Sequence, residues 1–91
     1  MEGIKYDQGK SRMELVDPKW LLSVGYVLGH GAEKYAPDNW KKVEKSRYVA
    51  AAMRHLLAYM DGEVFDQDSG LQHIAHASTC LMFIYAHNTK E

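Results

Sequence analysis

The chain has 91 residues, of which 46% are hydrophobic and 11% aromatic, and its formal net charge is −1 with the histidines neutral. This length predicts a single domain, residues 1–91, and the apolar fraction is typical of a globular protein rather than a disordered one. The near-neutral charge argues against a duplex nucleic acid as partner, because there is no general basic field to hold its phosphates.

The sequence also predicts a compartment. Cys80 is the single cysteine, which excludes an intrachain disulfide and fits a reducing cytoplasm. The first residues lack the apolar run of a signal peptide, and no apolar run is long enough for a membrane span. We therefore expect a soluble cytoplasmic protein, in the host cytoplasm if a phage encodes it, with no membrane partner.

Residues 1–16 are mainly polar and predict an arm ahead of the first helix. Asp17-Pro18 is a helix start signal, because the carboxylate can cap free N–H groups and proline suits the first helical position. This helix is predicted over residues 18–35. Gly25 and Gly29 share one of its faces and indicate a close approach by another backbone.

Two further helices are predicted, over residues 46–61 and 70–88, with a short helical turn at 40–44 between the first helix and the second. Gly62 would end the second helix, residues 63–67 would form a loop, and Asp68 or Ser69 would cap the third helix. The expected fold is an all-α bundle of three to four helices. Because the chain is small, we expect a homo-oligomer to complete its core.

The third predicted helix has two distinct sides at about 100° per residue. One side is predicted to form its core stripe: Leu71, Ile74, Ala75, Ser78, Leu81, Met82 and Tyr85. The other side carries His73, His76, Cys80 and His87. Apolar neighbours flank this second strip, so its imidazoles are expected to need polar partners.

The partners expected for these imidazoles lie nearby in the sequence and predict a divalent metal site. The candidate ligands are His55, Glu63, Asp66, His73 and His76. Imidazole nitrogen together with carboxylate oxygen favours Mn or a similar ion, with Mg as the alternative if the acids dominate. His55, Glu63 and Asp66 are also the candidate catalytic residues. A solvent-facing histidine strip, or histidines bonded only to backbone, remains the simpler alternative.

A second set of residues predicts a nucleotide site. Aromatic rings stack on nucleobases, while lysine and arginine neutralise phosphates. The candidates are Lys10, Arg12, Lys34, Tyr35, Asn39, Trp40 and Arg54. The alternative is that the aromatic residues are core and the cations are solvated.

Four pieces in order carry a family resemblance: Tyr6 to Arg12; Gly31 to Tyr35 with Asn39-Trp40; Arg54-His55; and Gly62 to His76. Together they resemble the N-terminal domain of the phage and bacterial dATP/dGTP diphosphohydrolases, and the resemblance covers nearly the whole chain. It implies a relation to the all-α MazG-like pyrophosphohydrolases, which cleave nucleoside triphosphates between the α and β phosphates with Mg or Mn. Their motif is E-x-x-E on one helix and E-x-x-D on the next.

This chain departs from the MazG-like motif. Arg54-His55 stands where paired acids are expected, and the third helix carries His73-x-x-His76. Three hypotheses follow: a metal-dependent hydrolase of a purine (deoxy)nucleoside triphosphate or related nucleotide, a phage protein that sequesters a nucleotide signal without cleaving it, and a structural oligomeric module.

Overall fold

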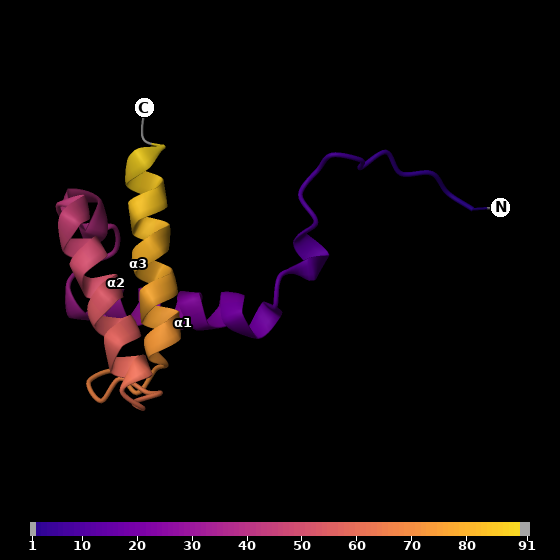
Figure 1. The fold of residues 1–91 in the computed structure, drawn as a ribbon. Coiled ribbons are helices and arrows are strands. Elements are labelled where there is room, and N and C mark those ends of the chain that lie inside the picture. Colours follow the sequence, from indigo (N-terminus) through magenta and orange to yellow (C-terminus); the bar gives the residue numbers. More distant parts are fainter. Residues whose placement is uncertain (1, 90–91) are drawn as a thin grey trace.

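The computed structural model describes residues 2–89 and is all-α, as predicted. It contains three helices, α1 (Pro18–Lys34), α2 (Lys45–Met60) and α3 (His73–Asn88), and two short 3-10 helices, η1 (Met13–Leu15) and η2 (Asn39–Lys42). Helices α2 and α3 run side by side in opposite directions, and α1 crosses them (Figure 1). Within residues 2–89 the sole β pairing is an isolated bridge between Phe65 and Gln72. No helix of the described residues is both long and apolar enough to cross a bilayer.

The boundaries of α1 and α2 follow local chemistry. The Asp17 carboxylate accepts a hydrogen bond from Trp20 N at 2.9 Å, which confirms the predicted cap. At the end of α2, Gly62 has a φ of +100°, and the N–H of Glu63 donates back to Ala58 O at 3.0 Å. This left-handed turn closes the last free carbonyls of the helix, as expected of a terminal glycine.

The start of α3 differs from the prediction. The helix begins at His73 rather than near residue 70, and its N-cap residue is Gln72, whose side chain makes no capping bond. The prediction that Asp68 or Ser69 caps α3 is therefore wrong. Gly70 has a φ of +74° and its N–H donates to Asp66 O, so the chain makes one more turn before the helix starts.

The packed interior consists of small side chains. The buried residues are Val24, Val27, Ala52, His73, Ala75, Ala77, Thr79 and Cys80. His73, Ala77 and Cys80 fall on one face of α3, at the i, i+4, i+7 spacing of a helix contact. Such small residues let helices approach one another closely.

The predicted core stripe of α3 is confirmed at Ala75, which is buried, but is wrong in the C-terminal half of the helix. Leu81, Met82 and Tyr85 are 56%, 36% and 69% exposed, whereas the histidine side of the helix is buried. The physical reason is that α2 covers the histidine side. The Gly25 and Gly29 positions are also uncovered, since a Cβ built on either would meet nothing within 4 Å.

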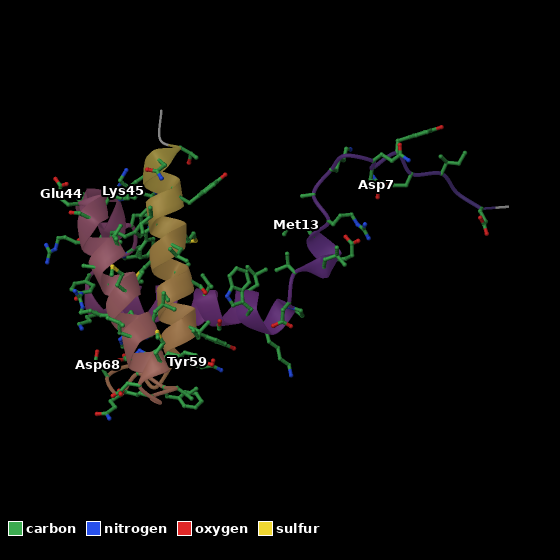
Figure 2. All side chains as sticks on the ribbon, viewed as in Figure 1. Asp7, Met13, Glu44, Lys45, Tyr59 and Asp68 are labelled. Carbon is green, nitrogen blue, oxygen red and sulfur yellow. The ribbon has the colours of Figure 1, made fainter. Side chains whose placement is uncertain are left out.

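The N-terminal arm leads away from the helices (Figure 1). Around Asp7 and Met13 its side chains stand clear of all three helices (Figure 2). Ile4, Tyr6 and Leu15 are 77%, 84% and 70% exposed, so the arm contributes no core to its own chain.

Candidate functional site

The five residues predicted to bind metal meet where the end of α2, the loop 61–72 and the start of α3 come together. His55 Nδ1 lies 2.8 Å from His73 Nδ1, and the His55 ring stacks on His76 with centroids 4.6 Å apart and planes 9° apart. The His55 ring therefore contacts both of the other imidazoles. We refer to His55, Glu63, Asp66, His73 and His76 as the histidine cluster.

Glu63 lies on the side of the His73 ring opposite to its contact with His55. Its Oε1 is 3.4 Å from His73 Nε2, and the His73 side chain is only 6% exposed. His73 Nε2 has no hydrogen-bond partner, so Glu63 is close to this nitrogen but not hydrogen-bonded to it. Contact with a carboxylate favours the tautomer in which Nε2 carries the proton. In that tautomer His73 Nδ1 is an acceptor and receives the hydrogen bond donated by His55 Nδ1.

Asp66 and Ser69 support His76. Ser69 donates to Asp66 Oδ2 through its backbone N–H at 3.1 Å and its hydroxyl at 3.0 Å. The Ser69 hydroxyl also lies 2.6 Å from His76 Nε2, and Asp66 Oδ2 is 3.6 Å from the same nitrogen. Ser69 was predicted only as a helix cap, and its contact with His76 was not predicted. The loop 61–72 folds back on itself through backbone hydrogen bonds and so brings Asp66 and Ser69 to His76.

The electrostatics of the cluster lower the pKa of two of its imidazoles, those of His55 and His76. Burial and the neighbouring His76 and His73 lower the pKa of His55. Burial also lowers the pKa of His76, against a smaller opposing effect of Asp66. For Asp66, burial raises the pKa, but the hydrogen bonds from Ser69 together with the nearby His76 and His55 more than offset it, so the pKa lies below the ordinary value. Near neutral pH His55 and His76 are therefore neutral, and Asp66 is ionised.

This donor set fits a divalent metal ion. One ligand atom each from His55, Asp66 and His73 lie within 4.8 Å of one another. Neutral imidazole nitrogen and a carboxylate are the forms that bind metal. Glu63 stands outside that set, on the far nitrogen of His73, where a carboxylate commonly orients a metal-binding imidazole.

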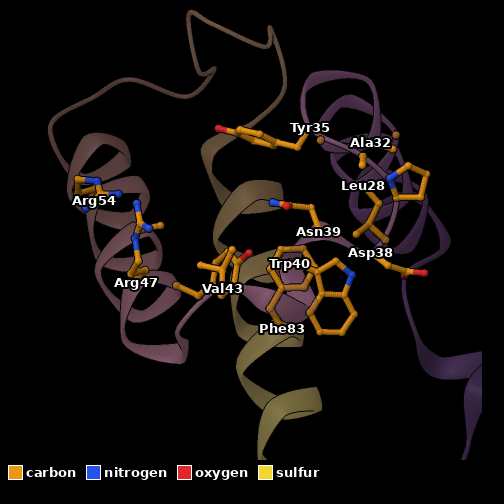
Figure 3. A pocket seen from close by; sticks show the side chains of 16 residues that line it. Leu28, Ala32, Tyr35, Asp38, Asn39, Trp40, Val43, Arg47, Arg54 and Phe83 are labelled. Carbon is orange, nitrogen blue, oxygen red and sulfur yellow. The ribbon is translucent and has the colours of Figure 1, made fainter.

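A separate cavity of about 850 Å³ opens between the end of α1, η2, α2 and α3 (Figure 3). Its lining includes four of the residues predicted to bind nucleotide, namely Tyr35, Asn39, Trp40 and Arg54. This volume falls within the range of small-molecule sites. None of the histidine cluster lines the cavity, but His55 directly follows Arg54 on α2.

One wall of the cavity is aromatic. Trp40 stacks on Phe83 with centroids 4.7 Å apart and planes 14° apart, so one face of its indole is already covered. Tyr35 is 66% exposed and stands on the opposite side of the opening from Trp40 (Figure 3). The amide of Asn39 lies between them in the same view. A planar ring entering here would meet aromatic faces and an amide.

The other wall is basic and includes Arg47, which was not among the predicted site residues. Arg47, Ala51 and Arg54 all line the cavity from α2. Their spacing places them on one face of the helix. That spacing, with a small residue between two arginines, is the signal that could have identified Arg47.

The structure does not bring the remaining candidates to the cavity. Lys10 and Arg12 lie in the arm, where Arg12 pairs with Glu14 at 2.6 Å. Lys34 points to the loop after α2, with its Nζ 3.5 Å from Asp68 Oδ2. Lys34 therefore helps tie α1 to the loop that carries Asp66.

Comparisons with known proteins agree with the resemblance stated above. Residues 1–91 match the family described as "dATP/dGTP diphosphohydrolase, N-terminal". The chain is also 41% identical over 85 residues to a protein of Salmonella phage PMBT28 named dATP/dGTP diphosphohydrolase. That alignment covers 93% of this chain but 29% of the phage protein, so the chain spans under a third of its relative. No solved structure matches the chain.

Proposed function

Because the chain belongs to the dATP/dGTP diphosphohydrolase N-terminal family, we propose that it binds a purine (deoxy)nucleoside triphosphate, or a related nucleotide, and hydrolyses its phosphate chain with the help of a divalent cation. The observation that carries this proposal is the junction at Arg54-His55. Arg54 lines the aromatic cavity, and the next residue belongs to the histidine cluster. A ligand whose phosphates contact Arg54 would therefore lie one residue along α2 from the cluster.

Each group has a role in this proposal. His55, Asp66 and His73 would hold Mn or Mg, with His76 beside them and Glu63 orienting His73. When bound, the ion would supply Lewis-acid polarisation of a phosphoryl oxygen and make water more acidic. Arg54 would bind the phosphates, and Tyr35 or Trp40 would stack on the base. A carboxylate oxygen of Glu63 or Asp66 would accept the proton of the attacking water. Acting on a nucleotide pool, the protein would work in the cytoplasm, the host's if a phage encodes it.

Incubation of the chain with a panel of nucleotides tests the proposal. We expect turnover of a purine nucleoside triphosphate with Mn²⁺ or Mg²⁺, detected by ion-exchange chromatography, and none with EDTA. His55→Ala should lower the rate by more than about 100-fold, since it removes a direct ligand. Lys19→Ala, an exposed residue away from both sites, should retain the wild-type rate. Turnover unaffected by EDTA would contradict the proposed metal dependence.

A second candidate is a protein that binds the nucleotide without cleaving it. The three candidate metal ligands His55, Asp66 and His73 include a single carboxylate, whereas the MazG-like motif supplies paired acids. A nucleotide that raises the melting temperature but is recovered intact after long incubation with Mn²⁺ would support this candidate over hydrolysis.

A further inference from the structure

The basic wall of the cavity holds two cations that lack counter-ions. Among residues 2–89, no carboxylate lies within salt-bridge distance of Arg47 or Arg54. The one acid in the cavity lining is Asp38, and its carboxylate pairs with Lys41 at 3.3 Å. The cavity is therefore positively charged on the α2 side.

The two arginines also share one side of the cavity. In Figure 3 both lie on the same side of α2, and the Arg47 side chain extends along the helix in the direction of Arg54. Ala51 lies between them in the sequence and also lines the cavity, so no bulky side chain separates them. Two like charges that share a cavity repel each other, and this repulsion is relieved by an anion that contacts both.

The length of this arrangement indicates which anion fits. Residues 47 and 54 are two helical turns apart, so their Cα atoms are separated by about 10 Å along α2. Each guanidinium can donate two parallel hydrogen bonds to a phosphate group. A chain of phosphates offers each arginine its own phosphoryl group, whereas a single phosphate must share its oxygens between the two guanidiniums.

We propose that Arg47 and Arg54 form a two-point clamp that selects ligands with two or more linked phosphates. This inference rests on the proposed function, and it adds Arg47 as a residue that determines specificity. Arg54, beside His55, holds the phosphates next to the histidine cluster, and Arg47 holds the part of the chain farther from it. The monophosphate left after cleavage between the α and β phosphates loses one contact, which favours its release.

Calorimetric titration of the full chain in EDTA tests the clamp, because binding is then measured without turnover. The ligands are deoxyadenosine, dAMP, dADP and dATP, with the guanine series in parallel. We expect wild-type affinity to rise along each series. Arg47→Ala should weaken dADP and dATP binding by about tenfold or more while changing dAMP binding less, since a hydrogen bond to a charged group contributes on that scale. Arg47→Lys should restore part of the loss, because it keeps the charge without the fork.

The controls separate this inference from the proposed function. Lys19→Ala removes an exposed cation outside the cavity and should leave the whole affinity series unchanged. Melting temperature and Mn²⁺ binding report whether Arg47→Ala is folded, and Arg47→Gln replaces it if it is not. Equal loss of dAMP and dATP affinity, or no loss of either, overturns the clamp while nucleotide turnover stands. Failure of the wild-type chain to bind any nucleotide overturns both.

Discussion

His73 is the residue on which the proposed metal site depends most. It is buried, its Nδ1 meets His55 at 2.8 Å and its Nε2 faces Glu63. We expect His73→Ala to weaken Mn²⁺ binding by more than about 100-fold, because loss of a group that only orients a ligand already costs about 10- to 100-fold. Titration calorimetry with Mn²⁺ measures the change.

The matched control for His73 is His87→Asn. His87 lies near the other end of α3, where its Nε2 approaches Trp40 O at 3.3 Å, outside the cluster. Its Mn²⁺ affinity should equal that of the wild type. If the two variants behave alike while both stay folded by circular dichroism, His73 does not bind the ion.

The neutral imidazoles also predict how stability depends on pH in the metal-free protein. Folding lowers the pKa values of His55 and His76 below the ordinary value of 6.5. Below pH 6.5 the unfolded chain then binds more protons than the folded chain, so the free energy of unfolding falls as the pH falls. We expect the melting temperature in EDTA to decrease between about pH 7.5 and about pH 5. A double variant, His55→Asn with His76→Asn, should show a smaller decrease, and an equal one would assign the effect to other groups.

Among single residues, the sequence predicted the histidine cluster better than the basic wall of the cavity. The i, i+3 spacing of His73 and His76 and the short loop before them restrict where Glu63 and Asp66 can lie, so their proximity was predictable. The directions of the Lys34 and Arg47 side chains were not predictable from the sequence. Lys34 turns to Asp68 because of how the loop folds back on α1, and Arg47 resembles any solvated arginine until the cavity is seen.

Among the elements, the turn after α2 controls the site because it starts the loop that carries Glu63 and Asp66. Gly62 adopts a φ of +100°, which costs other residues about 1–2 kcal/mol. We expect Gly62→Ala to lower the free energy of unfolding by about that amount, measured by urea denaturation. Gly3→Ala, in the open arm, is the control and should change stability by less than about 0.5 kcal/mol. Equal effects of the two variants would mean that the turn does not need a glycine.

Some helix ends could be predicted from the residues next to them, and others could not. Asp17-Pro18 and Gly62 act on their own helix ends, and both were predicted correctly. The start of α3 was missed because two hydrogen bonds across the loop, Asp66 N to Leu71 O and His73 N to Val64 O, hold residues 70–72 out of the helix. No feature of residues 68–72 alone encodes those bonds.

For the whole molecule, the single chain is more open than a compact protein of its size. Its accessible surface is 7539 Å², whereas a monomer of this mass normally exposes about 5400 Å². Its radius of gyration is 16.2 Å, against about 12 Å expected for this length. Large apolar side chains are exposed on all three helices, among them Tyr26, Leu57 and Leu81 at 65%, 58% and 56%.

This excess surface argues for the oligomer predicted from the sequence. A stable interface buries about 800 Å² on each partner, which is less than the excess. We expect sedimentation velocity to give at least a dimer at micromolar concentration. Tyr26→Asp, on the uncovered face of α1, should shift the protein toward monomer, whereas Lys19→Ala on the same helix should not. A wild-type monomer at all concentrations would contradict the prediction.

The small buried residues also constrain the chemistry. Ala52 precedes His55 by one turn of α2 and Ala77 follows His73 by one turn of α3, so both alanines lie where the two helices meet. These methyl groups act as spacers that fix the distance between the helices, and with it the separation of two candidate ligand nitrogens. A longer side chain at either position would widen that gap without touching a single polar group. Metal affinity could then be tuned entirely through hydrophobic volume.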